Sequence, residues 1–492
     1  MALAMTSVND EVSPPRSFAD KYVTSKNWWR YQSSSGDTVV AGSPLRLFRF
    51  ATQARSLLTA LETGQDLRSE NQIPGQSRVI DRLLEADAIH PLFDTNGPPS
   101  PLVSEITVVI PSKDTPAESL NRLVQNLPPV KDIIIIDDGS AEPIKAINRA
   151  TVHRLPTSRG PAGARNIGLS LVATALVCFI DSDIELPADA AQAQFWNPVL
   201  AHFQDPRIGL VAPRVQSSLG TTFLERYEMT DSPLDMGLRP ARLHPQGRIS
   251  YVPSAFMLAR TDELRPLGGF DETLRFGEDV DLVWRLVNRG VVCRYEPQVT
   301  VHHHPRSTWQ ELARQRFLYG TSAARLDARH PGNLAPLRLE KWTGVAWSSA
   351  VFGHPFVATL ITGISALRLR NSLPSNSMSN QERASIASRL VLRGNFLAGR
   401  ALAQAMNRTW WPLLTLAAVT SRRARWLCMS AVLIPTLIKW MKGTSDLNPV
   451  RYTGARVFDD LSYGAGVWAG VVKTRRVGPL LPLITAVRSR QL

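Results

Sequence analysis

The chain has 492 residues, of which 44% are hydrophobic and 20% are charged, and these proportions exclude wholesale disorder and allow buried cores. Single cores rarely grow beyond about 250–300 residues, so we expect several structural units. The formal net charge is +14, and residues 331–492 account for it, with 21 Lys and Arg against 5 Asp and Glu.

Three cysteines, Cys178, Cys293 and Cys428, lie far apart and lack the spacing of metal ligands or redox pairs. This usage favours a reducing compartment. Residues 1–20 are polar and contain no apolar segment of a secretory signal peptide. We therefore expect the protein on the cytoplasmic side of the cell membrane.

The N-terminal hundred residues contain one small periodic segment. Residues 1–35 are polar and rich in Ser, which predicts a disordered segment. Residues 37–50 alternate like a hairpin, and helical spacing follows near Leu57 and Leu83. We predict a small βα module over residues 36–94 and a Pro-rich linker over 95–104.

From residue 105 to residue 330, short apolar strands alternate with amphipathic helices. The clearest strands are residues 106–110, 133–136 and 176–180. This pattern predicts an α/β domain with a Rossmann-like, mostly parallel sheet and helices on both faces. Ligands bind at the carboxyl ends of strands in such sheets, so function is expected in the turns that follow them.

Two of these turns are suited to a nucleotide. Asp137-Asp138-Gly139-Ser140 follows a strand, and its carboxylates can accept hydrogen bonds from a uracil ring or ribose, although Asp and Gly are also ordinary turn residues. Residues 159–168 form a Gly-rich turn that opens a helix carrying Arg165. The amides at a helix start, together with the guanidinium of Arg165, could bind a diphosphate. An ordinary capped surface helix with a solvated Arg165 explains the same pattern equally well.

Carboxylates and histidines follow later strands. Asp181 and Asp183 stand at a strand end, where hard oxygen ligands can hold Mg²⁺ or Mn²⁺. Asp279 precedes a helical pattern, which is consistent with a general base or with simple helix capping. Residues 302–304 are three histidines at another strand end, and a neutral imidazole there can complete a metal site.

The C-terminal third combines basic and apolar residues. Residues 342–367 contain no charged residue over 26 positions, and shorter apolar runs follow. This pattern is compatible with a bilayer span formed by the first run and with interfacial helices formed by the others. The alternative is a helical cap on the preceding α/β domain. Because the excess charge lies among apolar runs without a base-stacking array, we expect a membrane surface and no nucleic acid as partner.

The ordered motifs together resemble the inverting A-type glycosyltransferases of family 2. The matched segments are residues 108–114, 137–140, 160–168, 181–183, 269–272 and 277–282 and the His-rich strand end. The resemblance implies the A-type fold, a UDP-sugar donor and Mn²⁺ or Mg²⁺ as cofactor. The usual Tyr-Asn pair is replaced by Lys113-Asp114, which leaves the base-stacking contact open.

The resemblance also assigns roles to residues. Pro111, Asp138 and Arg165 would bind the nucleotide sugar. Asp181 would contact both ribose and metal, and Asp183 would be the main metal ligand. Carried over in the same way, Asp279 would be the catalytic base. We predict His303 as the third metal ligand, ahead of its two neighbours, because it shares strand phase with Val299 and Val301.

A second resemblance concerns the substrate. Residues 36–94 look like the winged-helix-like module that recognises precursor peptides in cofactor pathways. Together with the catalytic domain and basic tail, they resemble the glycosyltransferase family of mycofactocin biosynthesis. This implies transfer of β-linked glucose from UDP-glucose to premycofactocin, building an oligosaccharide, with contact to a precursor peptide or pathway protein through the module.

Two other functions are compatible with the sequence. A glycosyltransferase of cell-envelope polysaccharide or lipid would also carry a basic, apolar tail. A non-catalytic sugar-nucleotide-binding scaffold would share the fold, although the complete set of Asp181, Asp183 and Asp279 argues against it.

Overall fold

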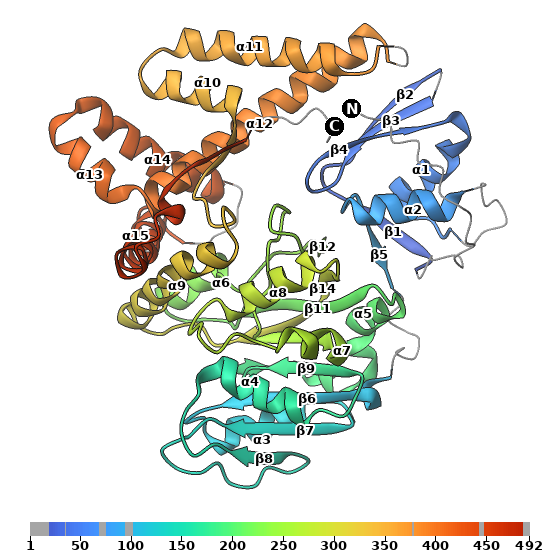
Figure 1. Ribbon diagram of the computed structural model, residues 1–492, viewed down its shortest axis with the longest axis vertical. Helices are drawn as coiled ribbons and strands as arrows, with labels where there is room; N and C mark the ends of the chain where they lie inside the picture. The colour runs from blue at the N-terminus through green and yellow to red at the C-terminus, as the bar shows by residue number, and fades with distance from the viewer. Residues whose placement is uncertain are drawn as a thin grey trace.

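The computed structural model describes residues 19–34, 36–67, 75–93, 102–375, 378–441 and 447–485. They form an N-terminal module, a central sheet domain and a C-terminal group of helices (Figure 1). The module and the C-terminal helices both lie at one end of the sheet domain (Figure 1).

The N-terminal module combines two small antiparallel sheets with two helices. The expected hairpin and helices are confirmed in it. Its elements are β1 (Lys21–Thr24), β2 (Trp29–Ser33), β3 (Gly36–Ala41), β4 (Arg46–Phe50), α1 (Arg55–Thr63), α2 (Gln76–Glu85) and β5 (Ile89–Leu92).

The expectation of a disordered segment over residues 1–35 is wrong for residues 21–33, which form β1 and β2. Tyr22 is buried in the module core, and Trp29 and Tyr31 pack in a second cluster. Large aromatic residues at alternating positions therefore order a segment whose overall composition is polar. Residues 1–18, residue 35 and most of the predicted linker, 94–101, lie outside the described residues.

The central domain is built on a nine-stranded mixed sheet. The three strands expected most clearly from the sequence are β6, β7 and β9. Its strands are β6 (Ile106–Ser112), β7 (Asp132–Asp137), β8 (Thr151–Arg154), β9 (Leu176–Ile180), β10 (Ile184–Glu185), β11 (Ile208–Ser217), β12 (Ala241–Arg242), β13 (Phe256–Arg260) and β14 (Val292–His303). Its helices are α3 (Ala117–Gln125), α4 (Gly160–Leu171), α5 (Asn197–Leu200), α6 (Phe223–Asp231), α7 (Thr261–Leu264), α8 (Glu278–Asn288) and α9 (Trp309–Arg329).

The strand order is β10-β14-β11-β13-β9-β6-β7-β8. Strands β9, β6, β7 and β8 are parallel, whereas β13 runs antiparallel to both of its neighbours. Alternate residues of β6 enter opposite cores, with Val108 packing in the cluster of α3 and Val109 in that of α4 and α8. The expected layers, helices on both faces of a mostly parallel sheet, are confirmed.

The C-terminal region is helical, with one short pair of strands. Its elements are β15 (Arg338–Glu340), α10 (Lys341–Val351), α11 (Pro355–Ser372), α12 (Asn380–Arg408), α13 (Trp411–Thr420), α14 (Arg422–Met441), α15 (Pro449–Thr474) and β16 (Leu483–Thr485).

The charge-free run of residues 342–367 is not one helix. It breaks between α10 and α11 at Gly353, which has a φ of 87°, and Pro355 then starts the second helix. Glycine adopts this left-handed conformation without strain, and proline is favoured at a helix start. Across the described residues, no helix has the length and apolar character needed to cross a membrane, so the bilayer span considered from the sequence is not supported.

The N-terminal sheet is covered on both faces. Val39 and Phe48 pack toward α1 and α2, while Val40 and Leu47 share a cluster with Leu369 of α11 and with residues of α12. The guanidinium groups of Arg389 and Arg393 on α12 also lie about 5 Å from the Trp29 ring. Contact of this module with a precursor peptide or pathway protein stays a prediction.

The last long helix, α15, packs directly on α9 of the central domain (Figure 1). Glycines permit this approach, since a Cβ added at Gly466 would lie 2.0 Å from the Phe317 carbonyl oxygen, and one at Gly470 would lie 2.6 Å from that of Thr321. The two backbones are therefore in contact. This part of the C-terminal region is a cap on the sheet domain, the alternative left open by the sequence.

A buried ionic cluster ties α6, α9 and α15 together. Arg316 on α9, 2% exposed, binds Glu228 of α6 at 2.8 Å and Asp459 of α15 at 3.0 Å. Asp231 of α6 pairs with Arg456 of α15 at 2.7 Å. Removing one member of such a buried set typically costs about 3–5 kcal/mol. Buried ion pairs therefore hold α15 on the central domain.

The α9–α15 contact predicts a difference between two Gly→Ala substitutions in the same helix. Gly466→Ala should lower the free energy of unfolding by about 1–3 kcal/mol, because the new methyl group overlaps the Phe317 carbonyl. Gly454→Ala is the matched control, since nothing lies within 4 Å of its added Cβ, and it should be neutral or stabilising by about 0.5–1 kcal/mol. Thermal unfolding of both variants measures this, and equal stability would contradict the packing.

Candidate active site

A cleft of about 540 Å³ lies where the central strands end. Its lining includes Asp114 after β6, Ser182 and Asp183 after β9, and His302 and His304 at the end of β14. Residues far apart in sequence thus meet at one edge of the sheet, as expected for an α/β fold. The hydroxyls of Thr115 and Ser182, 2.9 Å apart, connect the first two of these turns.

Asp138 holds the start of α4. Its carboxylate accepts hydrogen bonds from the Ser158 hydroxyl and from the amides of Arg159 and Gly160, at 2.6–2.9 Å. These contacts position the Gly-rich turn and use both carboxylate oxygens. Pro111, also assigned to nucleotide binding, lies buried in β6 opposite Ile136 of β7.

Arg165 joins two carboxylates inside the protein. Its guanidinium is 2% exposed and lies 2.6 Å from Asp181 and 3.0 Å from Glu278. Burial disfavours the charged form, but the two carboxylates outweigh it and raise the pKa of Arg165. The Nε atom of Arg165 is buried without a hydrogen-bond partner in the structure. Arg165 is therefore a bridge between α4, the end of β9 and the start of α8.

Asp181 and Asp183 differ in their surroundings. Burial raises the pKa of Asp181, while Arg165 opposes that rise and Asp183 adds to it. Asp183 is exposed in the cleft. Of the two strand-end carboxylates, Asp183 is thus the one directed to a ligand, and Asp181 is already engaged by Arg165.

The three histidines separate by strand phase. His303 is buried in phase with Val299 and Val301, as predicted. This burial lowers the pKa of His303. His302 and His304 line the cleft, whereas His303 does not. In the described part of the chain, no three His, Cys, Asp or Glu side chains lie where they could hold a metal ion. The structure therefore does not assemble the predicted ligand set of Asp181, Asp183 and His303.

Asp279 has the properties of a general base. It lies in the first turn of α8, one residue after Glu278. Burial, followed by the charge of Glu278, raises the pKa of Asp279 to about 7, against weaker opposing contributions that include a hydrogen bond from the Ser254 amide. A carboxyl group with a pKa near neutrality can accept a proton at physiological pH.

Asp281 has a structural role instead. Its carboxylate is fully buried and binds Arg285 at 2.6 Å, Arg329 at 2.8 Å and His330 at 2.9 Å. Burial would raise its pKa, but these partners lower it to about 2. A carboxylate this well paired is a poor proton acceptor, which leaves Asp279 as the base candidate of this segment.

The sequence did not predict that α9 packs beside the start of α8. Phe276 lies three residues before Asp279, and Tyr319 on α9 packs edge-on against it, with ring centroids 6.2 Å apart. An aromatic residue at one turn of an amphipathic helix carries no distinguishing signal, so only the folded structure reveals the contact.

Comparison with known proteins identifies related sequences. Residues 107–262 match the model of a family described as Glycosyl transferase family 2. Pre-mycofactocin glycosyltransferase of Mycobacterium tuberculosis (strain ATCC 25618 / H37Rv) is 36% identical over 466 residues, covering 91% of this chain and 95% of the relative. Poly-beta-1,6-N-acetyl-D-glucosamine synthase of Staphylococcus aureus (strain MW2) is 26% identical over 193 residues, covering 37% and 45%.

Among solved structures, the mannosyltransferase PcManGT from Pyrobaculum calidifontis, in complex with GDP-Man and Mn²⁺, aligns with a TM-score of 0.40. The sequence identity is 14%, and the alignment covers 78% of this chain and 88% of that protein.

Proposed function

This chain belongs to glycosyl transferase family 2 and to the family of pre-mycofactocin glycosyltransferase, and from its site we propose that it transfers glucose from UDP-glucose to premycofactocin with inversion. The chain is a glycosyltransferase with the A-type fold. The donor, the acceptor, the metal and the linkage are parts of the proposal.

The observation that carries the proposal is the connection between the cleft and the base. Arg165 contacts Asp181 at the end of β9 and Glu278 beside Asp279. A donor sugar bound at the strand ends would therefore lie next to a carboxyl group that can accept a proton at neutral pH. This combination suits attack by an acceptor hydroxyl on the anomeric carbon.

The residues at the cleft fit a divalent cation in part. Mg²⁺ commonly binds through one or two carboxylates together with substrate phosphates. Asp183, with Asp181 beside it, supplies such carboxylates, and a donor diphosphate would complete the ligands. His302 and His304 line the same cleft as Asp183, so we replace His303 by these two as candidates for a further ligand. When bound, the ion would stabilise negative charge on the leaving diphosphate.

One base is sufficient for a single displacement. The acceptor oxygen attacks opposite to the departing UDP, its proton passes to Asp279, and an α-linked donor gives a β-linked product. No enzyme nucleophile is required. Glu278 is committed to Arg165 and Asp281 to its three partners, so neither is available as a second base.

Asp279→Asn should lower kcat by about 10²–10⁴-fold and leave UDP binding nearly unchanged, because general-base catalysis contributes about that factor. In the wild type, kcat/KM should rise with pH and level off above about 7, since Asp279 must lose its proton to act. Turnover against pH and the anomeric coupling of the product measure this. An α-linked product, or near-normal turnover of the Asn variant, would contradict the proposal.

Asp183→Ala should abolish Mn²⁺- or Mg²⁺-dependent turnover and weaken Mn²⁺ binding in the presence of UDP, because it removes the exposed strand-end carboxylate. Asp189→Ala, which alters an exposed Asp nearby, is the control and should retain both. Calorimetric titration of Mn²⁺ reports binding separately from activity. Full turnover in excess chelator would rule out the metal.

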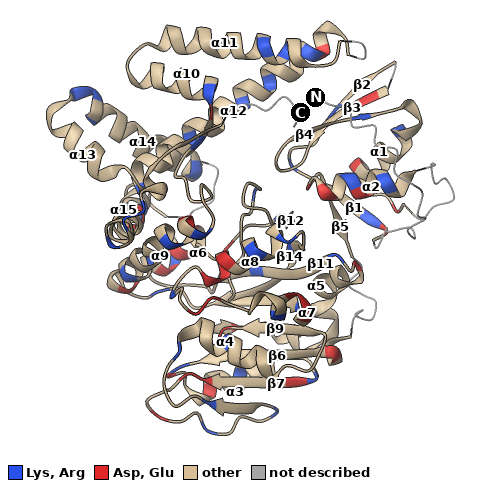
Figure 2. Ribbon diagram, viewed as in Figure 1, with Lys and Arg blue, Asp and Glu red and all other residues tan. Residues whose placement is uncertain are grey.

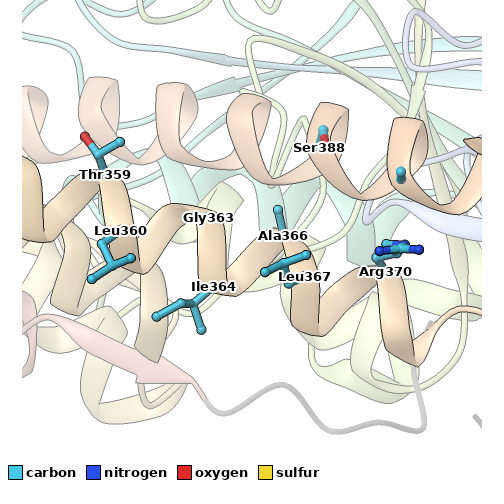
Figure 3. Close-up of a pocket in the computed structure, with 9 residues that line it drawn as sticks. Thr359, Leu360, Gly363, Ile364, Ala366, Leu367, Arg370 and Ser388 are labelled. Carbon is cyan, nitrogen blue, oxygen red and sulfur yellow. The ribbon is translucent and has the colours of Figure 1, made fainter.

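We also propose that the C-terminal helices rest on the cytoplasmic face of the membrane. Apolar side chains of α11, α13 and α14 are exposed, including Phe356 at 88% and Leu416 at 70%. Figure 3 shows Leu360, Ile364 and Leu367 along α11, beside α12 with Ser388. Lys and Arg gather where α13 meets α14 (Figure 2), the site of residues 422, 423 and 425. Apolar side chains with flanking arginines suit an anionic bilayer surface.

Binding to vesicles tests this surface. Replacing Arg422, Arg423 and Arg425 by Gln should weaken sedimentation with phosphatidylglycerol vesicles by roughly two orders of magnitude, since each basic residue contributes about 1 kcal/mol near such a surface. Leu416→Glu should weaken it further. Leu219→Glu, at a position 91% exposed on the central domain, is the control. Equal binding by all variants would contradict the proposal.

A further inference from the structure

A groove runs along α11 where this helix packs beside α12 (Figure 3). Its volume is about 480 Å³. It extends along α11 from Thr359 to Arg370, a length of roughly 16 Å at 1.5 Å per helical residue. Leu360 and Leu367 line it and are 64% and 55% exposed. Apolar surface is thus open to solvent along the groove, and covering it with an apolar ligand is favourable.

The middle of the groove is formed by small residues. Gly363 and Ala366 of α11 and Ala384 of α12 contribute no side chain larger than a methyl group. Among the described residues, nothing lies within 4 Å of a Cβ added at Gly363. The space over this position can therefore hold part of a ligand.

The walls of the groove offer few polar partners. The Thr359 hydroxyl donates to the Pro355 carbonyl oxygen at 3.0 Å, and the hydroxyls of Thr362 and Ser365 also donate to carbonyl oxygens of α11. Backbone groups in the middle of a helix are used by its own hydrogen bonds. An extended peptide would leave its N–H and C=O groups unpaired here, at an energetic cost, whereas an acyl chain has no such groups.

Arg370 gives one end of the groove a positive charge. Within the described chain, its buried Nε atom has no hydrogen-bond partner. Residues 355–395 contain five arginines and one acidic residue, Glu382. The Glu382 carboxylate is engaged at the start of α12, where it accepts a hydrogen bond from the Ser379 amide at 2.8 Å. The pair of helices therefore carries excess positive charge, and Arg370 is placed to pair with an anionic group.

We propose that this groove binds one acyl chain of an anionic phospholipid, with the phosphate of the headgroup at Arg370. The chain would lie over Gly363 and Ala366 and cover the exposed leucines, while the guanidinium would bind phosphate oxygens. A ligand that is apolar along its length and anionic at one end matches both the walls and the end of the groove. The proposal rests on the proposed membrane contact for the supply of lipid, since the groove itself is formed by α11 and α12 alone.

Monomeric lysophosphatidylglycerol, kept below its critical micelle concentration, is the probe for this site. Calorimetric titration of the full chain should show saturable binding. The dodecanoyl lipid should bind roughly tenfold more tightly than the decanoyl lipid, because burial of the additional methylene groups contributes about that factor.

Filling the groove should remove the site. Gly363→Leu should weaken binding of the dodecanoyl probe by roughly tenfold or more, because the new side chain occupies the space of the acyl chain. Gly394→Leu on α12 is the matched control, since its added Cβ is equally free of described neighbours and it lies outside the groove. It should bind the probe like the wild type. Neither variant should lower the thermal midpoint, because leucine favours a helix more than glycine does.

Removing the charge should have a smaller effect. Arg370→Gln should weaken binding roughly fivefold, the contribution of one basic residue near an anionic lipid. Arg400→Gln, at an exposed position farther along α12, is the control. Lysophosphatidylcholine, whose headgroup has no net charge, should bind the wild type about as weakly as lysophosphatidylglycerol binds Arg370→Gln.

The outcomes separate this proposal from the proposed membrane contact. Equal binding by the wild type and Gly363→Leu, or no binding by the wild type, would overturn the lipid groove. Glycerol phosphate that binds as tightly as the lipid would show a simple phosphate site and overturn the acyl chain. Sedimentation with phosphatidylglycerol vesicles tests the membrane contact separately, through the arginines at 422, 423 and 425. If vesicle binding fails while the monomeric lipid binds, only the membrane contact is overturned.

Discussion

The buried guanidinium of Arg165 is the constraint on which the site depends. A cation that is 2% exposed is tolerated only because two carboxylates, Asp181 and Glu278, offset the loss of hydration. These carboxylates come from the end of β9 and the start of α8, so one side chain of α4 fixes the distance between these two elements. Loss of Arg165 would leave both carboxylates without their partner, which explains why its role is structural as well as electrostatic.

The same bridge accounts for the different properties of two adjacent carboxylates. Glu278 is paired with Arg165, whereas Asp279 receives mainly backbone hydrogen bonds and the repulsion of Glu278. Burial raises the pKa of Asp279 to about 7, while the hydrogen bond from His330 and the charges of Arg285 and Arg329 lower the pKa of Asp281 to about 2. Pairing decides the function of each carboxylate in this helix turn.

Local sequence patterns predicted those parts of the fold that local chemistry determines. Runs of β-branched residues such as 133–136 favour buried strands, and the turns after them were correctly expected at one edge of the sheet. Contacts between distant segments were not predictable. The burial of His303 depends on the segments that pack behind β14. Asp138 binds the amides at the start of α4. On β2, Trp29 packs against Arg389 and Arg393 of α12. Each outcome was fixed by a partner far away in the chain.

The basic side chains of the C-terminal region fall into two groups. Several of its basic side chains are paired inside the protein. Arg456 with Asp231 holds α15 against the catalytic domain, and Arg408 with Asp460 holds α12 against α15. Others, such as the arginines where α13 meets α14, lie among exposed apolar side chains. The net charge of the sequence therefore overstates the charge available to a membrane. The helices of this region therefore differ in their surroundings, because α15 packs on α9 of the central domain while α11, α13 and α14 expose apolar side chains.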